Sequence, residues 1–126
     1  MKARQKIIML VLGALALSIA GCATIVDAGA ASVAYVRGDL QATLQTDINT
    51  AYNAAVKAVD KLELAVISKK KNALDAQIIS RTAKDKKVRI TLERTEADAA
   101  ALSIRIGLIG DEMQSRLILD QIKKNI

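Results

Sequence analysis

Apolar and polar side chains alternate one by one in several segments of this chain, and this pattern constrains the fold more than any other feature. The alternation runs over 34–44 and recurs over 74–82, 88–92 and 100–106. Successive side chains of a strand point to opposite faces of its sheet, so each segment predicts a strand with one buried side. A shorter apolar stretch, 64–68, predicts one more strand.

Two other segments carry apolar residues at the three- and four-residue spacing of a helix with one buried face. The first helix is expected to be capped by Thr46 or Asp47 and to run to about Lys61. The second is expected to be capped by Asp111, after the 107–110 loop, and to run to the C-terminus. The residues expected to be buried are Ile48, Tyr52, Ala55, Val56, Val59 and Leu62 in the first helix and Ser115, Ile118, Leu119, Ile122 and Ile126 in the second.

The expected order of elements is therefore strand, helix, four strands, helix. Short connections between the last four strands favour antiparallel neighbours, and strands with one buried side can be covered by both helices together. We expect residues 34–126 to form an α+β domain, a two-layer sandwich of an antiparallel sheet of about five strands with two helices on one face. Gly38 is expected in mid-strand, with Arg37 and Asp39 on the flat polar face.

The first 21 residues have the three parts of a secretory signal. Lys2, Arg4 and Lys6 supply a basic start, 7–17 are apolar, and 18–21 are mostly small. The apolar run is shorter than the roughly 20 residues that a permanent transmembrane helix needs. We therefore expect residues 1–21 to be a signal peptide that is removed.

Ile19, Ala20, Gly21 and Cys22 resemble the lipobox of bacterial lipoproteins. The resemblance implies that signal peptidase recognises Ile19, Ala20 and Gly21, and that Cys22 carries a diacylglycerol and an N-acyl chain. Residues 22–33 would then be a lipidated tether. Because Ala23 rather than Asp follows the cysteine, the sorting pattern of such lipoproteins implies the periplasmic face of the outer membrane. The periplasmic face of the inner membrane is the alternative.

The remaining chain resembles a family of small bacterial envelope lipoproteins whose function is undescribed. The resemblance rests on AYVRGDL at 34–40, SKKKNALDA at 68–76, SIRIG at 103–107, GDE at 110–112, Ser115-Arg116 and the Ile122-Lys123-Lys124 end. These motifs are typical of a fold, and they indicate no particular reaction. The resemblance therefore implies the architecture and the anchor, and it carries over no catalytic residue.

Composition excludes several chemistries. The chain has no histidine and its one cysteine is Cys22, which excludes an intrachain disulfide and the usual zinc site. No carboxylate pair has a spacing that suggests acid–base catalysis. Without the three basic residues of the signal, 16 of the 19 remain against 13 acidic residues, a bias too small to predict nucleic-acid binding. We expect no enzyme, metal or cofactor beyond the lipid on Cys22.

The outer face of the predicted sheet is the candidate partner-binding surface. The residues assigned to it are Tyr35, Arg37, Arg81, Arg89 and Arg105. Arginines there could bind an acidic protein surface or lipid headgroups, although an uncovered polar sheet face is also ordinary. The main interpretation is a membrane-anchored, non-enzymatic interaction or structural module with an envelope protein as partner. The alternative is a periplasmic module that binds lipid or a small apolar ligand, which predicts an enclosed apolar cavity between sheet and helices.

Overall fold

The computed structural model describes residues 33–126, and it places six strands and two helices there. The elements are β1 (Val33–Val36), β2 (Asp39–Leu44), α2 (Ile48–Lys61), β3 (Ala65–Lys71), β4 (Asp75–Arg81), β5 (Lys87–Glu96), β6 (Ala99–Ile106) and α3 (Glu112–Lys124). All strands join one antiparallel sheet in the order β1-β2-β6-β5-β4-β3. The α+β class and the antiparallel sheet are confirmed. The strand count and the order of elements are corrected, because two strands rather than one precede the first helix.

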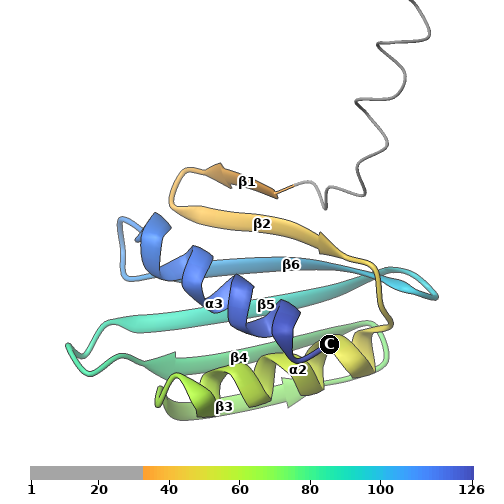
Figure 1. Ribbon diagram of the computed structural model, residues 1–126, viewed down its shortest axis with the longest axis horizontal. Helices are drawn as coiled ribbons and strands as arrows, with labels where there is room; N and C mark the ends of the chain where they lie inside the picture. Colours follow the sequence, from red (N-terminus) through yellow and green to blue (C-terminus); the bar gives the residue numbers. More distant parts are fainter. Residues whose placement is uncertain (1–32) are drawn as a thin grey trace, which may run out of the picture. The chain divides into compact units, whose positions relative to one another are not determined.

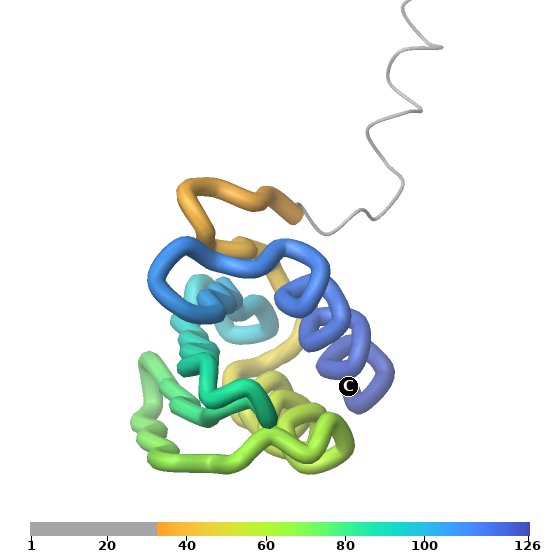
Figure 2. The backbone as a smooth tube through the Cα atoms, turned by 90° about the vertical axis from the view of Figure 1, so that its left-hand side faces the viewer, coloured from red at the N-terminus to blue at the C-terminus, as the bar shows by residue number. Residues whose placement is uncertain are grey.

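One side of this sheet carries the core. Alternate residues of β2, β4, β5 and β6 are buried, as the alternation predicts, and both helices pack against that side (Figure 1). Figure 2 shows the two layers end-on, with the helices together on one side of the strands. Neither of the two described helices covers the opposite side of the sheet, so the polar members of each strand face solvent there in the described part of the chain.

The first predicted strand is instead a hairpin, β1–β2. Arg37 and Gly38 have φ angles of +51° and +89° and form a two-residue turn, so Val36 pairs directly with Asp39. Both turn residues need a positive φ in the turn type that matches the twist of paired strands. Gly38 therefore lies at a turn and not in mid-strand.

This turn also reverses which residues of β1 face the helices. Tyr35 pairs with the buried Leu40, so both side chains lie on the helix side of the sheet. Ala34 and Val36 lie on the helix-free side, opposite to the prediction. The cause is geometrical. With a two-residue turn, each odd-numbered residue of β1 pairs with an even-numbered residue of β2, and paired residues share one side of the sheet.

Both helices begin where the sequence predicts, and α3 ends at Lys124, two residues before the predicted end. The carboxylates of Asp47 and Asp111 cap α2 and α3, each accepting a backbone N–H at 3.1 Å, and α2 ends at Lys61. The buried stripe of α2 differs, because its alanines line the core while Tyr52 and Val56 are half-buried and Leu62 is exposed. Small side chains let the helix lie close to the sheet. In α3 four of the five predicted residues are buried, and Ile126 is exposed beyond the helix end.

The second predicted strand is longer than expected and contains the lysine run. Lys69, Lys70 and Lys71 belong to β3, which was expected to end at Ser68. β3 is an edge strand with a register shift between Val66 and Ser68. Lysines and bulges are common on edge strands, because they discourage pairing with another sheet. Neither described helix is long and apolar enough to cross a membrane.

Candidate functional site

Three connections meet at one end of the sheet. They are the β1–β2 turn, the β4–β5 turn and the β6–α3 loop, all at the left of Figure 1 and toward the viewer in Figure 2. Two of them carry motifs that are distant in the sequence: Arg37-Gly38-Asp39, and the segment from Arg105 to Asp111. The fold therefore brings the family-like motifs at 34–40, 103–107 and 110–112 to one end of the sheet.

Two glycines allow the β1–β2 turn and the β6–α3 loop to touch through their backbones. A Cβ added to Gly110 would lie 2.5 Å from both the Cα and the carbonyl oxygen of Gly38. A Cβ on Gly38 would collide with the carbonyl oxygen of Ile109. Both glycines also have positive φ angles. Any side chain at either position would therefore push the two segments apart.

Arg105 ties the same two segments together. Its Nη1 donates to the carbonyl oxygen of Arg37 at 2.9 Å and to a carboxylate oxygen of Asp39 at 3.3 Å. Its Nη2 donates to the carbonyl oxygen of Leu108. We call this arrangement of Gly38, Gly110 and Arg105 the loop clasp. It holds the β6–α3 loop through backbone groups.

The clasp leaves the two middle residues of the loop in water. Leu108 is 92% exposed and Ile109 is 90% exposed, more than any other large apolar side chain of the described residues. Met113, in the first turn of α3, is 75% exposed. Single exposed aliphatic residues are ordinary, but two adjacent ones held by a dedicated set of contacts are not. We refer to Leu108 and Ile109 as the apolar tip.

A basic groove lies beside the apolar tip on the helix-free side of the sheet. It has a volume of about 440 Å³ and is lined by Arg81, Asp85, Lys86, Lys87, Arg89, Arg105, Gly107 and Leu108. Arg89 and Arg105 are direct neighbours across β5 and β6. The lining thus contains five cationic side chains and one carboxylate.

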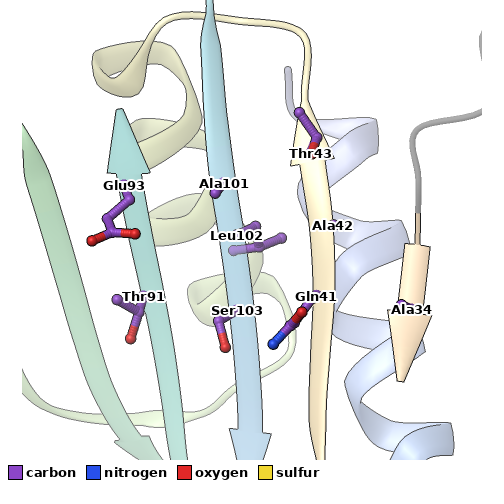
Figure 3. A pocket seen from close by; sticks show the side chains of 9 residues that line it. All are labelled: Ala34, Gln41, Ala42, Thr43, Thr91, Glu93, Ala101, Leu102 and Ser103. Atoms are coloured by element: carbon purple, nitrogen blue, oxygen red, sulfur yellow. The ribbon is translucent and has the colours of Figure 1, made fainter. Parts of the chain in front are cut away.

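A second hollow lies farther along the same side and differs in character. Figure 3 shows it from the helix-free side, with two rows of side chains running across β2, β6 and β5. The rows are Gln41, Ser103 and Thr91, and Thr43, Ala101 and Glu93. The hollow has a volume of about 410 Å³, and small or polar side chains make up most of its lining. Glu93 is its one charged group.

The predicted binding residues are only partly brought together. Arg81, Arg89 and Arg105 line the groove as the alternation places them. Arg37 lies in the neighbouring turn and contributes its carbonyl oxygen to the clasp. Tyr35 is corrected: it lies on the helix side of the sheet, with its hydroxyl near Gly110.

Four residues of this region are not among those assigned to the binding surface from the sequence. They are Lys86 and Lys87 at the start of β5, and Leu108 and Ile109 in the β6–α3 loop. A usable signal was present in Gly107-Leu108-Ile109-Gly110, where two aliphatic residues stand between glycines just before a helix cap. The residues of the expected lipid anchor, Ile19, Ala20, Gly21 and Cys22, lie outside the described residues, as do the signal peptide and most of the tether.

The described residues suit binding through charge and apolar contact. The pKa of Asp47 is lowered, chiefly because the hydroxyl of Thr50 donates to its carboxylate at 2.6 Å. That carboxylate is a helix cap, so its shifted pKa has a structural cause.

Within residues 33–126, no group of three or more His, Cys, Asp or Glu residues could hold a metal ion. The arrangement at the clasp end can hold anions and present an aliphatic surface.

Comparison with known proteins identifies a family whose function is unknown. A family model described as "Protein of unknown function (DUF3568)" matches residues 6–125. No curated protein matches the chain. The match spans nearly all of the sequence and includes every residue of the clasp, the tip and the groove. The chain therefore belongs to the DUF3568 family of proteins of unknown function.

Proposed function

We propose that this protein is a membrane-anchored, non-enzymatic envelope lipoprotein whose folded domain binds an anionic partner in the basic groove. The observation that carries the proposal is the gathering of Arg81, Arg89 and Arg105 with two lysines around a single carboxylate. Cationic side chains on adjacent strands repel one another. A fold that collects them on one uncovered surface is best explained by an anionic group that binds there.

The balance of paired and unpaired charges supports this binding surface. Arg81 is paired with Asp85 at 3.2 Å, and Arg105 with Asp39 at 3.3 Å. Among residues 33–126, Lys86, Lys87 and Arg89 have no carboxylate within ion-pair distance. These three cations are therefore free to bind a partner, while the paired arginines fix the walls of the groove.

The anchor is supported by the lipobox-like residues at the start of the chain. We propose that Cys22 is diacylated and N-acylated and that the domain faces the periplasm from the outer membrane. Replacing the cysteine, Cys22→Ala, tests this in cells fed radiolabelled palmitate. The label should enter the unaltered protein and be absent from the variant, which should also leave the membrane fraction. Equal label in both proteins would reject the anchor.

The alternative of a buried apolar ligand has less support. The basic groove, the hollow of Figure 3 and a third hollow beside β3 and β4 are lined largely by strand residues on the helix-free side. None of these three lies between the sheet and the helices. Buried residues of four strands and both helices form one continuous core in that space. The binding surface is therefore sought outside the sandwich.

Photo-crosslinking in cells tests the groove directly. A photoreactive residue placed at Arg89 should give an adduct with a partner, because its side chain is exposed and faces the groove. The control position is Lys57, which is exposed on α2, away from the groove. Adducts at Arg89 but not at Lys57 would support the proposal. Identical labelling at both positions, or neither a protein adduct nor a lipid adduct at Arg89, would reject it.

A further inference from the structure

We infer that the anionic partner is a phospholipid surface, into which the apolar tip inserts while the groove cations bind headgroup phosphates. This inference rests on the proposed function and names the partner of the same groove. It also assigns a role to Leu108 and Ile109, which the groove alone does not explain. The surface combines two features in one place: a rigid aliphatic point and a set of free cations.

The tip is fixed before it meets a partner. The Arg105 guanidinium bonds the carbonyl oxygen of Leu108, and Gly110 packs against the backbone of Gly38. Leu108 and Ile109 therefore cannot turn inward to escape water without breaking the clasp. A preorganised apolar element loses little conformational entropy when it inserts.

The electrostatics at this end of the sheet favour an anionic surface despite nearby carboxylates. Asp85 is paired with Arg81, and Glu112 with Arg116 at 3.0 Å. Asp111 accepts the backbone N–H of Gln114 as a helix cap. The neighbouring acids are thus engaged, whereas the lysines and Arg89 of the groove are free, and cations near an anionic membrane are attracted to it.

The kind of side chain at the tip favours lipid over protein. Protein interfaces take much of their affinity from buried aromatic residues. This chain has only two aromatic residues, Tyr35 and Tyr52, and both are half-buried against the core. Two aliphatic side chains beside lysines match the layering of a membrane, where apolar chains lie below charged headgroups. Such binding is weak for a free protein but effective for one already tethered to a bilayer.

Fluorescence from a probe at the tip provides the first test. A chain that begins at Ala23 keeps the whole compact unit, which is residues 31–126, together with its core, and it has no cysteine. Ile109→Cys then allows a single environment-sensitive dye to be attached. The dye should shift to shorter wavelength with vesicles of phosphatidylcholine and phosphatidylglycerol, and not with phosphatidylcholine alone. The control is Leu74→Cys. The Leu74 side chain is 67% exposed and lies in the β3–β4 turn at the other end of the sheet.

Vesicle sedimentation provides the second test, with matched variants. Leu108→Ser combined with Ile109→Ser should weaken binding to the anionic vesicles at least about tenfold, and Arg89→Glu about tenfold. The control for the tip is Leu74→Ser, which changes an exposed aliphatic residue elsewhere. The control for Arg89 is Lys57→Glu, which reverses an exposed positive charge elsewhere. Both controls should leave binding unchanged. Both sets should keep the unfolding midpoint of the parent chain, since all five positions are exposed.

The outcomes separate this inference from the proposed function. No dye shift at position 109, or an equal shift at position 74, overturns the lipid inference. If the Arg89 crosslink still captures one protein in cells, the groove binds a protein and the proposed function stands. Absence of both the dye shift and the Arg89 adduct rejects the two proposals together. Loss of binding in the serine variant but not in its control supports insertion.

Discussion

Two glycines of the β6–α3 loop allow the contribution of close packing to be separated from that of backbone angle. Gly107 and Gly110 both have positive φ angles, at +68° and +95°. A Cβ at Gly107 would meet no atom within 4 Å, whereas one at Gly110 would overlap Gly38. We expect Gly107→Ala to lower the free energy of unfolding by about 1–2 kcal/mol and Gly110→Ala by about 1–3 kcal/mol more. Equal losses in chemical denaturation would contradict the clasp.

A buried hydroxyl gives a second prediction for a single residue. Ser115 is fully buried in α3, and its hydroxyl has no hydrogen-bond partner among the described residues. Ser115→Ala removes the cost of desolvating that hydroxyl and improves helix propensity. We expect the free energy of unfolding to rise by about 1 kcal/mol in urea denaturation. Ser103→Ala, on the half-exposed side of β6, should change it by less than about 0.5 kcal/mol.

The contribution of Arg105 to the loop clasp can be tested by removing its side chain. Arg105→Ala removes the bonds to the β1–β2 turn and to the β6–α3 loop. We expect faster amide hydrogen exchange in residues 107–110 and a loss of about 1–3 kcal/mol in the free energy of unfolding. Arg89→Ala serves as the control, because Arg89 lies opposite Arg105 on β5 and has no ion pair within residues 33–126. Similar exchange rates in the two variants would show that Arg105 does not hold the loop.

The cap of α2 makes stability depend on pH in a defined direction. Bonds from Thr50 lower the pKa of Asp47 below its usual 3.8, so the folded state favours the charged carboxylate. The resulting stabilisation is complete above the usual value and is lost as pH falls through the lowered pKa. Asp47→Asn keeps a capping side chain without the charge. The difference in unfolding temperature between the two proteins should therefore be larger at neutral pH than in acid; a difference that grows in acid would contradict it.

Elements with local causes were predicted well, and those that depend on a distant partner were not. Asp111 was identified as a cap, and Asp47 as one of two candidates with Thr46, because a cap needs only the next few residues. The β1–β2 hairpin was read as one strand because the apolar residues on both sides of Gly38 keep the same parity. Arg37-Gly38 also lacks the Asn-Gly or Asp-Gly pair that usually marks such a turn. The position of Tyr35 followed from that one error.

At the scale of the whole molecule, the candidate site was predicted in part. Alternation alone places Arg81, Arg89 and Arg105 on one side of the sheet. Their approach to the apolar tip could not be predicted, because it depends on the contact between Gly38 and Gly110, which are 72 positions apart in the chain. A contact between two residues that are far apart in the chain produces no periodic pattern in a single sequence.

The compact unit should fold without the residues that precede it. Among the described residues, the fully buried side chains of its core run from Leu40 to Ile122, with Val33 and Tyr35 packed against them. We expect chains that begin at Ala23 and at Ala31 to unfold in one cooperative transition, with midpoints within about 3 °C of each other. Thermal melts followed by circular dichroism would measure this. A markedly lower midpoint for the shorter chain would show that residues 23–30 contribute to folding.

The placement of β1 has a mechanical consequence. β1 joins the sheet only through four residue pairs with β2, and none of its own side chains is fully buried. Tension applied through the chain before Val33 would therefore load this short ladder first. Release of residues 33–36 would lengthen the connection by roughly 13 Å while the loop clasp and β2 stay in place. The strand could act as a small extensible link that yields under force before the domain unfolds.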